Sequence, residues 1–259
     1  MGWGLGESKW SPVPSVGGGG SSVTAVSEAL TASAGAVSVV GGKLSGGMLD
    51  GWAISNPGSV IDSMVDDGSS LSVKLTQTSV GGGGNDSWAE HKNAAFTQSA
   101  IHWPNLLMGD FEIEVKFAWA VHANAFSGLS LVTFQFANTV NGWSHHSGVR
   151  ASNWLATTLK PRKAAAAQGT IGYQDAGTLV AADDNWLKLK RTGQALQAWY
   201  RPDTGSYTEI SDGETHFGVE GGNVFVGLGF NTRDTSSPGT EDVRIMNVNL
   251  TGFEYTATP

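Results

Sequence analysis

Three acidic residues are spaced two positions apart in the stretch DFEIEVKF, and their chemistry could be that of a glycosidase: Asp110, Glu112 and Glu114. Residues i and i+2 of a strand share one face and lie about 6.6–6.8 Å apart along the chain. Retaining glycosidases need a nucleophile and an acid whose carboxyl groups are about 5–5.5 Å apart. The run continues to Lys116, which is typical of a solvated face of alternating charge. The pattern therefore favours a non-catalytic surface.

A second group of candidates lies in NGWSHHSGVRASNWL, residues 141–155. Sugar-binding sites combine flat aromatic faces with side chains that form hydrogen bonds to hydroxyl groups. The alternative is a place in the core or in a subunit interface, because tryptophan is largely buried on average. The residues that we predict to bind glycan are Trp143, His145, Arg150, Asn153 and Trp154.

The sequence gives little support to a metal site. His145 and His146 are adjacent on an expected strand, where neighbours point to opposite faces, and no carboxylate is close in sequence. Asp183, Asp184 and Asn185 offer the oxygen ligands that calcium prefers, but the full loop pattern is missing and a polar turn is favoured. We therefore expect no metal and no cofactor, with calcium left open.

Composition excludes several further classes of function. The chain has no cysteine, so disulfides, thiolate metal sites and a cysteine nucleophile are excluded. It has no G-x-S-x-G motif, and its glycine runs at 17–20 and 81–84 lack the Lys-Ser/Thr of a phosphate loop. The net charge of −8 disfavours nucleic acid and anionic membranes as partners. We expect neither a secretory signal nor membrane insertion, and synthesis in the cytoplasm.

Most of the chain after Leu49 has the alternating pattern of strands. Apolar residues occupy every second position in 71–75 and 110–119, while 129–137 and 223–231 are more apolar, as central strands are. Residues 186–210 predict a three-stranded meander that turns at Thr192-Gly193 and again at 202–205. The apolar parity changes between Ile245 and Val248, which predicts a β-bulge near Met246–Asn247.

Residues 1–46 differ from the rest in being rich in glycine, serine, alanine and valine. Such a segment is a flexible coil by itself, and chain ends are ordered only when they are tied down. We predict an extended N-terminal arm that contacts other subunits of an assembly. Its aromatic and apolar anchors are expected to be Trp3, Leu5 and Trp10.

Several short segments together resemble the concanavalin A-like lectin/glucanase (laminin-G-like) jelly rolls, over roughly residues 49–255. They are MGDFEIEVKF, FSGLSLVTF, NWLKLKRTGQALQAWYRPDTGSYTEI, VFVGLGF and MNVNLTGFEY. The resemblance implies two antiparallel sheets of six or seven strands, one of them concave, with glycans bound on that face or its rim, sometimes with calcium. Glycosidases of this superfamily carry E-x-D-x-E on one strand, and the order D-x-E-x-E at 110–114 departs from it.

The predicted fold class is an all-β, two-sheet antiparallel sandwich with an N-terminal arm over residues 1–46 and the sandwich over residues 47–259. The predicted function is that of a non-catalytic structural or attachment protein of a viral particle, as a capsid decoration or tail protein. Its partners would be other subunits and polymeric or cell-surface glycans, and its location the virion. The alternatives are a free-standing carbohydrate-binding module or lectin, which would be extracellular, and a glycoside hydrolase that uses Glu112 and Glu114.

Overall fold

A computed structural model describes the fold for residues 21–56, 61–76, 99–121, 128–136, 143–155, 158–167, 170–175, 177–193, 195–210, 223–231 and 240–257. These residues form strands, turns and irregular segments. None of them belongs to a helix that could span a membrane. The predicted anchors Trp3, Leu5 and Trp10 lie outside the described residues.

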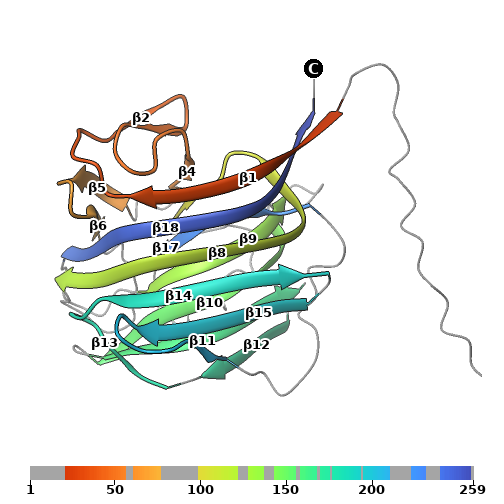
Figure 1. The fold of residues 1–259 in the computed structure, drawn as a ribbon. Coiled ribbons are helices and arrows are strands. Elements are labelled where there is room, and N and C mark those ends of the chain that lie inside the picture. The colour runs from red at the N-terminus through yellow and green to blue at the C-terminus, as the bar shows by residue number, and fades with distance from the viewer. Residues whose placement is uncertain are drawn as a thin grey trace, which may run out of the picture.

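The strands form two antiparallel sheets that lie one over the other (Figure 1). Sheet A has the order β16–β15–β14–β8–β18–β6–β5. Strand β6 pairs with residues 240–245 of β18, and β1 pairs with residues 247–257 of the same strand. Its strands are β1 (Ser21–Thr31), β5 (Ile61–Asp66), β6 (Leu71–Thr76), β8 (Leu106–Val121), β14 (Asn185–Thr192), β15 (Ala195–Pro202), β16 (Thr208–Glu209) and β18 (Thr240–Ala257).

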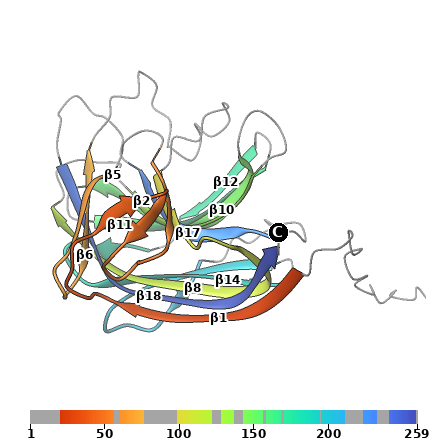
Figure 2. The same ribbon diagram turned by 90° about the horizontal axis from the view of Figure 1, so that it is seen from above.

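Sheet B has the order β12–β11–β10–β9–β17–β7–β4–β3–β2, and β13 pairs with β11. Seen from above, β1, β18, β8 and β14 form one layer, and β10, β11, β12 and β17 lie across from it (Figure 2). The strands of sheet B are β2 (Ser38–Val40), β3 (Lys43–Ser45), β4 (Ala53–Ser55), β7 (Ser99–His102), β9 (Gly128–Phe136), β10 (Trp143–Leu155), β11 (Thr158–Ala167), β12 (Thr170–Asp175), β13 (Leu179–Val180) and β17 (Phe225–Asn231).

The core lies between the two sheets and is built by the period of two along each strand. On β8, the residues at odd positions from Phe111 to Trp119 are buried, and Glu112, Glu114 and Lys116 face outward. Strand β14 buries Leu187 and Leu189 in the same way. Burial of this many apolar side chains is the main force that holds the sheets together. The predicted all-β, two-sheet antiparallel sandwich of jelly-roll type is confirmed.

Several local predictions are also confirmed. The register between β18 and β8 shifts between Ile245 and Asn247, at the predicted bulge. Strands β14, β15 and β16 form the predicted meander. Gly193 has the positive φ of 60° that its turn requires, and the second turn is closed by the amide of Gly205, which donates to the carbonyl of Pro202 at 3.0 Å.

The predicted boundary of the N-terminal arm is wrong for residues 21–46, because these residues belong to the sandwich. Strand β1 pairs with β18 over eleven residues, β2 and β3 form a hairpin, and Leu44 is buried in the core. The glycine content is explained by turns, since Gly41 and Gly42 adopt positive φ between β2 and β3. The arm hypothesis is therefore restricted to residues 1–20.

Candidate functional site on the outer face of sheet A

The acidic residues of β8 lie on the outer face of sheet A, where they pair with lysines of β14. Lys188 Nζ is 2.9 Å from Glu112 Oε1 and 3.4 Å from Glu114 Oε1. Lys190 Nζ is 3.8 Å from Glu112 Oε2. The antiparallel register sets Glu114 opposite Lys188 and Glu112 opposite Lys190. The interpretation of this strand as a face of alternating charge is confirmed.

This arrangement is poorly suited to acid–base catalysis by Glu112 and Glu114. A glycosidase acid must deliver a proton to the leaving group, whereas the carboxyl groups of Glu112 and Glu114 are both engaged in ion pairs with Lys188. Burial lowers the pKa of Lys188, but the hydrogen bonds and ion pairs with both glutamates outweigh it and raise the pKa above its usual value. Lys188 is therefore a permanent cation at neutral pH, and the two carboxylates are its counter-ions.

Aromatic rings and cations alternate on the neighbouring strands of the same face. The guanidinium of Arg201 lies 4.6 Å from the ring centroid of Trp186 and 4.8 Å from that of Tyr207. The ammonium of Lys188 lies 5.3 Å from the ring of Tyr207 and 5.4 Å from that of Trp199. We call Trp186, Arg201, Tyr207, Lys188 and Trp199 the aromatic–cation stack. Such contacts contribute about 0.5–1 kcal/mol each at exposed sites, so the stack holds its rings in fixed positions.

Acidic groups complete the polar network around the stack. Lys116 Nζ lies 2.9 Å from Asp184 Oδ2 and 3.0 Å from Asp203 Oδ1, and the indole N–H of Trp186 donates to Asp203 Oδ1 at 2.9 Å. The indole hydrogen bond, together with Lys116, lowers the pKa of Asp203 below its usual value. Burial raises the pKa of the Tyr207 hydroxyl to about 12, so this group stays neutral in physiological conditions.

The segment 183–185 forms the polar turn that the sequence favoured. The amide of Asn185 donates to the carbonyl oxygens of Val180 at 2.8 Å and of Asp183 at 2.6 Å. Asp184 is engaged in the ion pair with Lys116. In the described part of the chain, no three His, Cys, Asp or Glu side chains are grouped as a metal site requires.

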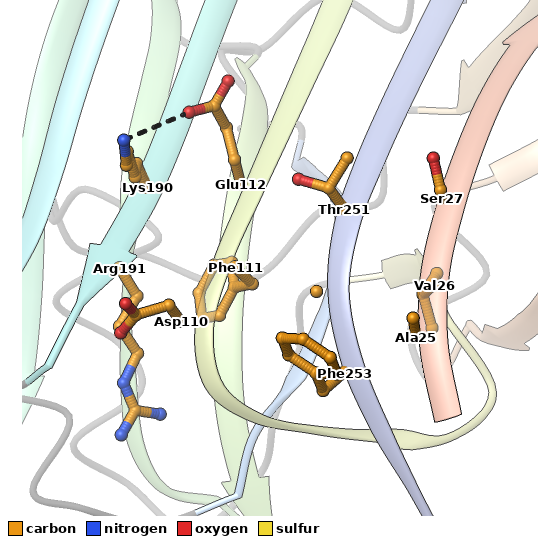
Figure 3. Close-up of a pocket in the computed structure, with 11 residues that line it drawn as sticks. Ala25, Val26, Ser27, Asp110, Phe111, Glu112, Lys190, Arg191, Thr251 and Phe253 are labelled. Atoms are coloured by element: carbon orange, nitrogen blue, oxygen red, sulfur yellow. Dashed lines mark ion pairs between the residues drawn. The ribbon is translucent and has the colours of Figure 1, made fainter. Parts of the chain in front are cut away.

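A groove of about 440 Å³ opens on this face beside the ion pairs between β8 and β14, and it extends across β1, β18, β8 and β14 (Figure 3). We define the groove by six residues that line it, which are Ser27, Asp110, Glu112, Lys190, Thr251 and Phe253. Its shape follows from an irregularity in β8, where the four steps from Met108 to Glu112 face only the two steps from Thr251 to Phe253. Gly109 takes a φ of 61° within this bulge.

The groove combines an aromatic surface with hydrogen-bonding groups. The side chain of Phe253 is 51% exposed, so a large apolar ring faces solvent. The register aligns Lys190, Glu112, Thr251 and Ser27 in one row across the four strands. Asp110 is held in place by the amide of Gly193, which donates to its Oδ1 at 2.7 Å. An exposed ring beside fixed carboxylates and hydroxyls is a surface that can bind the apolar face and the hydroxyls of a sugar.

The residues predicted to bind glycan occur on β10 of sheet B, away from the groove. Position 145 is paired with Gln135 and position 150 with Ser130, in an unbroken stretch of register with β9. The two positions are an odd number of residues apart and so belong to opposite faces of the sheet. The side chains of Trp143, His145, Arg150, Asn153 and Trp154 lie outside the described part of the structure, and their role stays a prediction.

Sequence reasoning missed the groove and the stack. The signal for the stack was present, because Trp186 and Trp199 occupy the same parity as charged residues of β14 and β15 instead of the parity of leucine. The signal for the groove was weaker. Phe253 has the parity of Thr251, opposite to that of the buried Val248 and Leu250, but it is a single aromatic residue near the end of β18.

Comparisons with known proteins find folds of similar kind but no family. No family model and no curated protein matches this chain. Among solved structures, an alginate lyase from Klebsiella pneumoniae aligns at 6% identity and a TM-score of 0.49, covering 73% of this chain and 84% of that one. A beta-1,3-glucanase from Mycobacterium marinum aligns at 10% identity and a TM-score of 0.48, covering 77% and 90%.

The carbohydrate recognition domain of Emp47p aligns at 11% identity and a TM-score of 0.46, covering 86% of this chain and 94% of that one. At these identities and scores the likenesses assign neither a family nor an activity. What is established for this chain is an all-β antiparallel sandwich.

Proposed function

We propose that this chain is a non-catalytic glycan-binding β-sandwich whose ligand lies in the groove on the outer face of sheet A. The observation that carries the proposal is the exposed ring of Phe253 beside the carboxylates of Asp110 and Glu112. Sugars present apolar C–H faces and rows of hydroxyls, and this pairing of an aromatic platform with fixed acceptors is complementary to both. The aromatic–cation stack on the neighbouring strands extends the same face.

We propose a non-catalytic function because the acidic side chains of this face are engaged in ion pairs and hydrogen bonds within the protein. Glu112 and Glu114 share the ammonium of Lys188, and Asp110 accepts a backbone hydrogen bond. Each of these acidic side chains thus already has a partner within the protein. Cleavage of a polysaccharide that is lost in Glu112→Gln or Glu114→Gln would overturn this part of the proposal and favour the hydrolase alternative.

Binding to an array of immobilised neutral and acidic oligosaccharides tests the function. We expect the chain to retain a defined set of glycans, and Phe253→Ala to weaken binding to them by roughly tenfold or more, as loss of an aromatic anchor does. Asp110→Ala should weaken binding in the same range, because a buried sugar hydroxyl would lose its acceptor. Calorimetry with the tightest-binding oligosaccharide gives the dissociation constants.

Val180→Ala is the matched control, since Val180 is also 51% exposed and does not line the groove. It should bind as the unaltered chain does. The pair Trp143→Ala and Trp154→Ala tests the rival surface on β10. If these substitutions abolish binding and Phe253→Ala does not, the ligand belongs to sheet B and the groove is not the site.

We further propose that the chain acts within a larger assembly, of which a viral particle is the form suggested by its sequence. This part rests on the composition of residues 1–20, with Trp3, Leu5 and Trp10 as subunit contacts. Deletion of residues 1–20, and not of residues 1–46, is the appropriate test, because β1 to β3 belong to the sandwich. We expect the shortened chain to keep its melting temperature and to lose incorporation into particles. Full incorporation would contradict the assembly role.

A further inference from the structure

Strand β1 forms an edge of sheet A that differs from the other sheet edges in the described ranges. It pairs with β18 over its whole length of eleven residues. The side of β1 that faces away from β18 has no strand partner among the described residues. The strands at the other ends of the two sheets are shorter: β16 has two residues, β2 has three, and β5 and β12 have six each. Strand β5 also carries a bulge and two aspartates.

Natural sheets protect their edges by short strands, bulges, prolines or charges, since an open edge is a template for another strand. The sequence of β1, SSVTAVSEALT, has none of these apart from one charge at Glu28. It is rich in the β-branched and small side chains that fit a pleated surface. Among the residues of β1 whose burial is described, Val26 alone is buried, and Val23 is 58% exposed. The edge is therefore long and nearly uncharged.

We propose that β1 pairs with β1 of a second copy of this chain, in antiparallel orientation about a two-fold axis, so that sheet A continues from one copy into the other. A two-fold axis keeps each residue on its own face only if the register is centred on a residue. Full overlap of Ser21–Thr31 centres the register on Val26. Residue 23 then lies opposite residue 29 of the partner, and residue 24 opposite residue 28.

The charge of the strand supports this register. Centred on Val26, the register sets Glu28 opposite a threonine hydroxyl of the partner, which can donate to the carboxylate. A register centred on position 28 would instead set two glutamates against each other, which is destabilising. On the outer face, the pairs in the proposed register are formed by small uncharged residues, Val23 with Ala29 and Ala25 with Ser27. The edge is thus self-complementary, as an isologous interface requires.

The pairing also gives the sandwich a wider binding face. Phe253 pairs with Ala25, one strand in from the edge. Two copies of Phe253 would lie on one continuous sheet, three strand spacings or about 14 Å apart across the strands and two residues apart along them. Two grooves at this distance could engage one polymeric ligand together.

Sedimentation velocity on the full chain tests the proposal. We expect a monomer–dimer equilibrium with a dissociation constant in the micromolar range. The double variant Val23→Lys/Ala29→Lys should raise that constant about tenfold or more, because it sets two pairs of lysines against each other across the axis. Neither position faces a charge within its own chain, where the partners are Tyr255 and Asn249, so the monomer should melt as the unaltered chain does.

Val23→Lys/Ala29→Glu is the register-specific control. It changes the same two positions but sets lysine opposite glutamate, so the dimer should persist or tighten. A chain that is monomeric up to about 100 µM, or a lysine–lysine variant that dimerises as well as the unaltered chain, would overturn the proposal. The second outcome would place the contact elsewhere, residues 1–20 included.

Discussion

Replacement of Gly227 by valine is expected to leave the chain unable to form a stable sandwich. Gly227 lies on β17, where it is paired with Val132 of β9 on one side and with His102 of β7 on the other. A Cβ at this position would lie 2.6 Å from both Cα and Cβ of His102 and would also collide with the carbonyl oxygen of Ile101. The colliding atoms are mainly backbone of a neighbouring strand, so no side-chain rotation can relieve the clash.

The expected loss of unfolding free energy exceeds about 3 kcal/mol, the upper end of what overpacking usually costs. A loss of that size is a large part of the total stability of a domain. Circular dichroism and urea unfolding measure it, and Gly227→Ala should show a smaller loss in the same direction. Gly35→Ala is the matched control, because a Cβ there meets its nearest neighbours only at 3.8 Å. Equal stability of Gly227→Val and Gly35→Ala would contradict the close approach of β7 and β17.

The layers of this fold could be predicted from its sequence because the relevant physics is local. Alternation along 110–119 fixes which residues of β8 enter the core, and the parity change after Ile245 fixes the bulge in β18. What failed was the treatment of residues 21–46 as one segment of uniform composition. Glycine there serves two turns, while Val26 and Leu44 supply the buried contacts. An average over the segment conceals that division of roles.

The candidate site depends on cross-strand register, which a sequence does not display. Ser27, Glu112, Lys190 and Thr251 come from four strands and meet only because three cross-strand registers, one of them interrupted by bulges, align them. Conversely, Trp143, His145, Arg150, Asn153 and Trp154 were grouped because they are close along the chain. Closeness along one strand does not establish a common face, as the odd separation of positions 145 and 150 illustrates.

Replacement of Asp66 by alanine is expected to destabilise the connection between β1, β3 and β5. Asp66 is only 4% exposed, and its carboxylate accepts three backbone hydrogen bonds. Its Oδ2 accepts from the amides of Ser33 at 3.1 Å and Met48 at 2.8 Å, and its Oδ1 from the amide of Gly68 at 3.0 Å. One side chain thus ties its own segment to two others, which are 18 and 33 residues away in sequence.

Alanine would leave these donors without their acceptor, and a donor left unsatisfied in a buried place costs about 1–3 kcal/mol. Since the amide of Met48 is buried while the other two are partly exposed, we expect a total loss of about 3 kcal/mol. Urea unfolding gives this loss as a lower midpoint with an unchanged slope. The hydrogen-exchange rate of the Met48 amide should rise by the factor that corresponds to this free energy.

Two further variants separate the role of this carboxylate from that of a general loop residue. Asp66→Asn can keep an oxygen toward Ser33 and Met48 but sets an amide N–H against that of Gly68, so its loss should be smaller than that of alanine. Asp67→Ala removes an exposed carboxylate that also accepts two backbone hydrogen bonds, from Ser69 and Ser70. Because water can replace those bonds, Asp66→Ala must be the more destabilising of the two. If Asp67→Ala were the more destabilising variant, burial of the Asp66 carboxylate would not be what makes its hydrogen bonds important.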